Sequence, residues 1–415
     1  MTDIDIESEE GAQAKVDAHE ELDNPHAESA SMADLEDVGG GEIYVQETEP
    51  SETPDPFPEG PGGVWYEKTF NVGGRELWMF EPEERVQSGV TVDDNVVYFG
   101  SGDDNAYAVD ADNGVELWSF SAGGRIQSGF AVGDNAVYFG ANDRSAYAVD
   151  REDGTELWEF ETGFNVNSGF ALGEDVVYFG SNDDNAYAVD REDGTEVWSF
   201  SAGDSVGSGV VLGEDAVYFG SRNGNAYAVD REDGTELWEF ETGSTVGTGF
   251  ALGEDAVYFG SSDDNGYAVD REDGTEVWSF STGGAVQTGV ALDEDAVYFG
   301  SRNGNAYAVD REDGTEVWSF STGDSLQTGF AVDERAVYFG SDDENAYAVD
   351  REDGTEVWSF STGISMESGF ALSETGVFFG TNGSDVGVFR LGRVRDAYRP
   401  ARVSDGDKWI SLVDE

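Results

Sequence analysis

A 40-residue period most constrains what this chain can fold into. The stretch AYAVDREDGTELW, residues 146–158, returns along the chain with few changes. Eight tryptophans follow one another at this interval without an insertion: Trp78, Trp118, Trp158, Trp198, Trp238, Trp278, Trp318 and Trp358. A period of this size predicts a repeat architecture in which each repeat is one supersecondary unit that stacks on its neighbours.

Each repeat contains four short apolar segments. In one copy they are residues 128–132, 136–140, 146–150 and 156–160, rich in Val, Tyr, Phe and Trp and separated by Gly, Asp, Asn and Ser. This pattern is typical of hairpin-linked strands. Four antiparallel strands per 40 residues predict an all-β fold, a β-propeller with one four-stranded blade per repeat.

The two ends of the repeat region are incomplete in complementary ways. Residues 75–80 form a fourth strand with no first three strands before it, whereas residues 368–372, 376–380 and 386–390 form three strands with no fourth after them. Pairing of the two ends would give an eight-bladed β-propeller closed by N- and C-terminal strands, which removes two exposed sheet edges. The alternative is a local fourth strand at residues 394–398.

The chain divides into three predicted parts. Residues 1–63 lack the repeat and are expected to form a disordered acidic tail, because their first 60 residues hold 19 acidic residues and one lysine. Residues 64–392 are the predicted propeller, and residues 393–415 are a C-terminal extension. A basic cluster at this end, expected to bind an acidic partner or to fold back onto the propeller, comprises Arg390, Arg393, Arg395, Arg399 and Arg402.

The residues Ala148, Asp150, Gly154 and Trp158 resemble, in order and spacing, the tryptophan-docking motif of the pyrroloquinoline-quinone-type (PQQ-like) propeller repeat. The resemblance covers roughly residues 75–390. It implies that the tryptophans pack between blades. The superfamily resembled includes quinoprotein alcohol dehydrogenases, assembly scaffolds such as outer-membrane assembly lipoproteins, and sensor domains, so the resemblance predicts fold more specifically than function.

The charge balance of 89 acidic against 21 basic residues gives a formal net charge of -68. Such self-repulsion destabilises a compact state unless salt screens it. We therefore expect a haloarchaeal origin and a salt-rich cytoplasm, with an ordinary acidic protein as the alternative. Nucleic acid is not expected as a partner, because the acidic protein would repel its phosphates. The sequence shows no export signal and no apolar run of membrane-spanning length, which predicts a cytoplasmic protein. We expect this protein to be a monomer.

Catalytic chemistry has few residues to use in the repeats. Cysteine is absent, and both histidines, His19 and His26, precede the repeats. The quinone dehydrogenases resembled here use a disulfide of adjacent cysteines and a calcium ion, and their cofactor-site motifs have no counterpart in this sequence. The REDGT turn, residues 151–155, does not follow a calcium-loop pattern. We expect Asp150 to accept hydrogen bonds from the amides of this turn instead.

Sequence variation among the repeats is concentrated in two connections: fourth strand to first strand, and second strand to third. In an up-and-down blade both emerge on one face, which is where recognition is expected. The candidate ligand- or partner-binding residues at the channel mouth of this face are Arg85, Gln87, Arg125, Gln127, Asn165, Asn167, Gln287, Gln327 and Glu367. Arg85 and Arg125 occupy equivalent positions in adjacent blades and are expected to hold one anion.

The sequence therefore predicts a non-enzymatic propeller scaffold that binds a protein or small-molecule ligand at this channel mouth, with no resident metal or cofactor. The alternatives are a dehydrogenase that carries PQQ with calcium and a sensor module of a signalling system.

Overall fold

The computed structural model describes residues 76–366, 368–374, 376–381 and 387–392 and, outside them, the backbone of five strands. These strands are β1 (Thr2–Ile4), β2 (Ile43–Glu47), β3 (Val64–Lys68), β36 (Arg399–Arg402) and β37 (Trp409–Leu412). One compact unit spans Gly74–Arg393; the other combines Met1–Gly73 with Val394–Glu415. Residue 64, the predicted start of the propeller, lies in β3, which pairs with β2 in the second unit. Most of the predicted tail, residues 1–63, lies outside the described residues, and its disorder stays a prediction.

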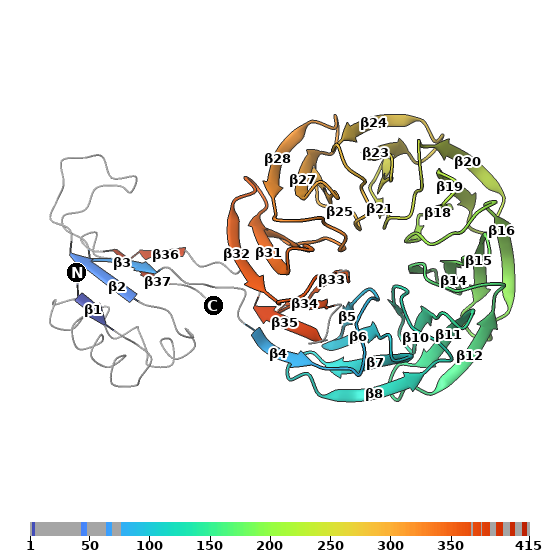
Figure 1. Ribbon diagram of the computed structural model, residues 1–415, viewed down its shortest axis with the longest axis horizontal. Helices are drawn as coiled ribbons and strands as arrows, with labels where there is room; N and C mark the ends of the chain where they lie inside the picture. The colour runs from blue at the N-terminus through green and yellow to red at the C-terminus, as the bar shows by residue number, and fades with distance from the viewer. Residues whose placement is uncertain are drawn as a thin grey trace. The chain divides into compact units, whose positions relative to one another are not determined.

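The unit Gly74–Arg393 is a ring of eight four-stranded antiparallel sheets (Figure 1). Blades 1 to 3 consist of β5 (Thr91–Asp93), β6 (Val96–Gly100), β7 (Asn105–Asp110) and β8 (Glu116–Ser121); β9 (Ala131–Val132), β10 (Ala136–Gly140), β11 (Ser145–Asp150) and β12 (Glu156–Glu161); and β13 (Phe170–Leu172), β14 (Val176–Gly180), β15 (Asn185–Asp190) and β16 (Glu196–Ser201). Blades 4 and 5 consist of β17 (Val211–Leu212), β18 (Ala216–Gly220), β19 (Asn225–Asp230) and β20 (Glu236–Glu241); and β21 (Ala251–Leu252), β22 (Ala256–Gly260), β23 (Asn265–Asp270) and β24 (Glu276–Ser281).

Blades 6 and 7 consist of β25 (Ala291–Leu292), β26 (Ala296–Gly300), β27 (Asn305–Asp310) and β28 (Glu316–Ser321); and β29 (Ala331–Val332), β30 (Ala336–Gly340), β31 (Asn345–Asp350) and β32 (Glu356–Ser361). Blade 8 consists of β33 (Phe370–Leu372), β34 (Gly376–Gly380), β35 (Val388–Gly392) and β4 (Glu76–Phe80). In each blade the first strand lies nearest the channel and the fourth lies on the outer wall (Figure 1).

The ring is closed by strands from both ends of the repeat region, as the sequence predicts. β35 pairs antiparallel with β4, with Arg390 opposite Trp78. The prediction of eight blades and of a clasp formed by residues 75–80 is thereby confirmed. The alternative strand, residues 394–398, lies outside the described residues.

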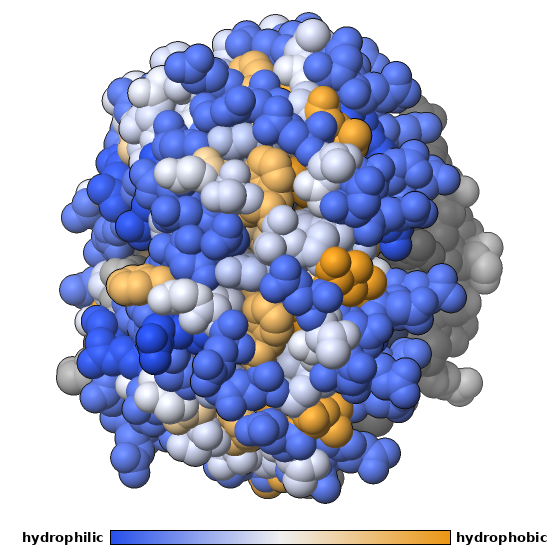
Figure 2. All heavy atoms as spheres, turned by 90° about the vertical axis from the view of Figure 1, so that its right-hand side faces the viewer, coloured by the Kyte–Doolittle hydropathy of each residue, from blue (hydrophilic) through white to orange (hydrophobic). Residues whose placement is uncertain are grey.

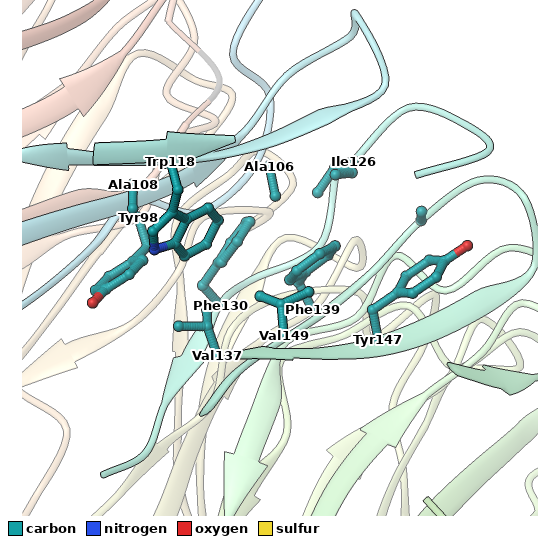
Figure 3. Packing of buried hydrophobic residues seen from close by; sticks show 11 residues of the cluster. Tyr98, Ala106, Ala108, Trp118, Ile126, Phe130, Val137, Phe139, Tyr147 and Val149 are labelled. Carbon is teal, nitrogen blue, oxygen red and sulfur yellow. The ribbon is translucent and has the colours of Figure 1, made fainter. Parts of the chain in front are cut away.

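Aromatic side chains fill the interfaces between neighbouring blades. Between blades 1 and 2, Trp118 and Tyr98 pack with Phe139 and Tyr147 in one buried cluster (Figure 3). The Trp118 indole donates a hydrogen bond to the carbonyl of Arg151 in the next blade, at 2.9 Å. Its ring lies against Gly154, where an added Cβ would come within 2.8 Å of the indole and where φ is +72°. Only glycine combines that conformation with that close approach.

The REDGT turns also join adjacent blades. The Arg151 guanidinium donates to the Tyr98 hydroxyl at 3.3 Å and to the carbonyl of Gly133 at 3.3 Å. The same turn is ordered by Asp150, whose carboxylate accepts the amides of Glu152 and Asp153. The expected role of Asp150 is confirmed.

The interface between blades 8 and 1 is bridged by a different arginine. Blade 1 carries Ala111 where six other blades carry the arginine of the REDGT turn, and Phe378 replaces the tyrosine that this arginine would contact. Arg390 of blade 8 spans the interface instead: it donates to the carbonyl of Asp112 at 2.8 Å and lies 3.5 Å from its carboxylate. Arg390 is buried and contacts the propeller, as the second expectation for the basic cluster has it; Arg393 and Arg395 lie outside the described residues.

The outer wall is formed by fourth strands, which are exposed sheet edges. One aliphatic side chain per blade is about half exposed there, as with Leu117 and Val317, both 51%. Figure 2 shows such side chains scattered among hydrophilic residues on one side of the ring. The neighbouring residues include exposed glutamates such as Glu156 and Glu159, whose charge protects an edge from pairing with another chain.

We predict that Arg390→Ala lowers the free energy of unfolding by about 2 kcal/mol or more, because it removes charge-assisted hydrogen bonds and buried packing at the closing interface. Denaturant unfolding measures this change. Arg222→Ala, at an exposed turn, is the control and should change stability by less than about 0.5 kcal/mol. Equal stability of the Arg390 variant and the control would contradict the assigned role.

Candidate binding face at the channel mouth

The two variable connections lie together on one face of the ring, which we call the varied face. The amide of Gly102, between β6 and β7, donates to the carbonyl of Arg85, in the connection that leads into β5. The corresponding bonds in the next two blades join Asn142 to Arg125 and Asn182 to Asn165, each at 2.9 Å. These bonds confirm that the two connections emerge on the same face.

A Ser-Gly or Thr-Gly pair ends each connection and lies at the centre of the ring. The buried Ser128 hydroxyl accepts the amide of Gly140 at 2.8 Å. The following Gly129 approaches the next blade so closely that an added Cβ would lie 3.2 Å from the Cα of Gly169. This pair recurs in all eight repeats, a signal that could have identified the channel wall from the sequence.

In the seven repeats where it is described, the residue just before the pair lies at the channel mouth. Three amide side chains form a continuous chain there: Asn142 donates to Gln127 at 2.9 Å, and Gln127 donates to Gln87 at 3.0 Å. The Oδ1 atoms of Asn142 and Asn167 are buried without a hydrogen-bond partner among the described residues. The structure therefore brings Gln87 and Gln127 together, as the sequence analysis expects of residues at one channel mouth.

Two further predicted residues lie on the same face, in the connections that lead into blades 6 and 7. Gln287 donates to the Ser262 hydroxyl at 2.8 Å. Gln327 donates to Asp342 at 2.7 Å and accepts from Arg302 at 2.9 Å. Both therefore link connections to neighbouring turns, while Glu367 lies outside the described residues.

The two arginines expected to share an anion are in different surroundings. A terminal nitrogen of Arg125 lies 3.7 Å from a carboxylate oxygen of Glu84, and these side chains are 47% and 50% exposed. Arg85 is half-buried and makes no ion pair with a described residue. An anion bound by both arginines would have to compete with Glu84 for Arg125.

The turn between the second and third strands controls a nearby peptide group. In blade 2, Asp143 accepts the amide of Gly123 and the hydroxyl of Tyr147. Burial and the Asp143 carboxylate both raise the pKa of Tyr147. In blade 4 an asparagine occupies this position, and Asn223 donates to the carbonyl of Ala202 at 2.7 Å.

The glycine that follows the carbonyl contacted by this asparagine has a positive φ. Gly203 has a φ of +80°, and Gly283, which precedes the asparagine-containing turn of blade 6, has +78°. Where the turn carries aspartate, the backbone amide of the residue equivalent to Gly203 donates to that aspartate instead. This residue need not be glycine: in blade 1 it is Glu83, whose amide donates to Asp103 at 3.0 Å. The choice between Asp and Asn thus accompanies a reversal of one peptide group.

We predict that Gly203→Ala destabilises the propeller by about 1 kcal/mol, since an added Cβ meets no atom within 4 Å and only the positive φ opposes it. Adding Asn223→Asp should recover part of the loss, because aspartate favours the opposite peptide orientation. Thermal or denaturant unfolding of the single and double variants measures this coupling. Additive effects of the two substitutions would contradict it.

Sequence reasoning selected residues from only one of the two variable connections and so missed three arginines of the varied face. Arg144, Arg222 and Arg302 lie in turns between second and third strands and are exposed. The signal was present, because blades 4 and 6 read SRNG where other blades read acidic turns such as SNDD.

The described residues contain neither a helix suited to crossing a membrane nor a group of three or more His, Asp or Glu arranged to hold a metal ion. A search of curated proteins gives no match.

Among solved structures, BamB from Moraxella catarrhalis is 15% identical with a TM-score of 0.67, over 78% of this chain and 99% of that chain. The computationally designed Ika8 protein is 18% identical with a TM-score of 0.69, over 76% and 100%. The quinohemoprotein alcohol dehydrogenase ADHIIG from Pseudomonas putida HK5 is 13% identical with a TM-score of 0.68, over 80% and 79%. At these identities the likeness shows the fold alone.

The sequence itself matches a family model in three overlapping segments, residues 68–193, 182–285 and 266–399. Together they span the propeller, and the chain belongs to the PQQ-like propeller family described as outer membrane protein assembly factor BamB.

Proposed function

We propose that this protein is a non-enzymatic propeller scaffold that binds a partner protein through the channel mouth of the varied face, without a resident cofactor. The observation that carries the proposal is that arginine side chains make contacts within the protein on one face and lack them on the other. On the opposite face, the REDGT arginines are engaged between blades: Arg191 donates to Tyr138 and to the carbonyl of Gly173, and Arg351 lies 3.3 Å from Asp293.

On the varied face, the side chains of Arg85, Arg144 and Arg222 make neither a hydrogen bond nor an ion pair with a described residue. In a protein with 89 acidic residues, arginines left without such contacts on one face support an intermolecular role. Loops held by a rigid scaffold are also where recognition usually lies. The repeats hold no histidine or cysteine, which supports binding over catalysis.

We predict that the double variant Arg85→Ala and Arg125→Ala loses a partner that the unaltered protein retains from a native high-salt extract. Arg335→Ala, on the opposite face, is the control for a lost arginine and should keep it. Quantitative pull-down with thermal melting of each variant measures binding and folding separately. Unchanged retention by the double variant would remove the proposed role of this site.

We also propose that the protein acts in a salt-rich cytoplasm. The support is electrostatic: a net charge of -68 repels itself strongly in dilute buffer, and at about 1 M salt the screening length falls to roughly 3 Å.

We predict that the melting temperature rises as potassium chloride is increased from dilute buffer to about 1 M, because screening relieves this repulsion. Sucrose at equal osmolarity is the control for non-ionic effects. A melting temperature that does not depend on salt would contradict the high-salt setting.

A further inference from the structure

Two turns of the varied face depart from the acidic pattern in the same way. The turns of blades 4 and 6, residues 221–224 and 301–304, both read SRNG and contain no carboxylate. The corresponding turns of blades 1, 2, 3, 5 and 7 each contain one to three. Blade 5 lies between the two SRNG turns in the ring (Figure 1), so two positive side chains flank one blade.

The donors in this sector remain available to a partner. Arg222 is exposed and makes no ion pair with a described residue. Arg302 donates from one terminal nitrogen to Gln327, which leaves other N–H groups of its guanidinium free to donate. Between them in blade 5, the Ser262 hydroxyl accepts from Gln287 and can still donate its own hydrogen.

The turns that carry Arg222 and Arg302 are less negative than the equivalent turns elsewhere, whereas the turn of Ser262 keeps Asp263 and Asp264, and part of the nearby channel mouth is more open. Asn223 and Asn303 replace the aspartate present in the turns of blades 1, 2, 3, 5 and 7. At the channel mouth, Gly207 and Gly247 stand where other repeats carry Gln, Asn or Glu. A Cβ added at Gly207 would meet only Asn182 Oδ1, at 3.4 Å, and one at Gly247 only a methyl of Thr245, at 3.5 Å.

We propose that the arc formed by Arg222, Ser262 and Arg302 binds an extended acidic peptide segment of the partner. The inference rests on the proposed function and names the chemistry that the partner presents. The donors lie on three successive blades and do not converge on one point, which suits several carboxylates along an extended chain better than one compact anion. Charge-assisted hydrogen bonds from the arginines to carboxylates supply the specificity.

The chain itself provides a fold-compatible variant for the test. Blade 5 carries SSDD where blades 4 and 6 carry SRNG, and Asp264 adopts a positive φ of 76° at the position of Gly224 and Gly304. Replacing both SRNG turns with the blade 5 sequence, by R222S/N223D/G224D and R302S/N303D/G304D, should therefore preserve the blades. The reciprocal variant, S262R/D263N/D264G, extends the arc by one arginine.

The probe is a fluorescent peptide of alternating Glu and Gly, with a Gln-Gly peptide of equal length as its control. Anisotropy at about 1 M potassium chloride limits long-range repulsion by the rest of the protein. We expect the Glu-Gly peptide to bind the unaltered protein, to bind the double-turn variant about tenfold more weakly, and to bind the reciprocal variant more tightly. The Gln-Gly peptide should not bind.

Equal binding of the Glu-Gly peptide to the unaltered protein and to the folded double-turn variant would overturn the inference, as would no binding to the unaltered protein. Binding of tripolyphosphate in place of the peptide would overturn it in favour of a phosphate ligand. Partner retention by the Arg85 and Arg125 variants is measured separately, so the proposed function can stand where this inference fails.

Discussion

The structure depends on a contact that recurs at seven of the eight blade interfaces, between the tryptophan of an outer strand and the glycine turn of the next blade. A propeller blade has two faces to bury, and neither can be buried without a neighbour. In this chain one indole packs on the backbone of the adjacent turn and donates to its carbonyl, as Trp158 does to Arg191 at 3.0 Å. Large aromatic rings bury much apolar area, and the indole N–H requires a partner when it is buried. Repetition of this contact turns eight local sheets into one ring.

The closing blade shows how the ring accommodates the interruption of the chain. Trp358 faces blade 8, which has no turn joining a third strand to a fourth, because β4 comes from the other end of the repeat region. Its indole nitrogen is buried and has no hydrogen-bond partner among the described residues. Across the other side of the same blade, Arg390 performs the bridging that an arginine of the REDGT turn performs elsewhere. Within the part of the chain that the structure describes, closure therefore leaves one indole donor without a partner and replaces one bridging arginine by another.

The sequence was sufficient for the architecture because the signals were redundant. The tryptophan period, the strand pattern and the complementary ends all lead to eight blades, and the variable connections were expected on one face. The details of the site depend on interactions between segments far apart in the sequence. The proximity of Glu84 to Arg125 and the burial of Arg390 follow from how adjacent blades pack, which the repeat pattern does not encode. Arg222 and Arg302 are visible in the sequence as departures from the acidic pattern, but they lie in the second-to-third turns, whereas the predicted site residues all lie in the fourth-to-first connections.

The paired behaviour of the aspartate-or-asparagine position and its neighbouring glycine has a consequence for how such a protein can diversify. Gly203 and Gly123 tolerate opposite orientations of the same peptide group, so a turn can lose its carboxylate while the strands around it keep their register. A duplicated repeat can thus acquire a new surface charge through a few substitutions in one short loop, with the interior of the blade unaffected. The fold separates the residues that evolution can vary from those that hold the ring together.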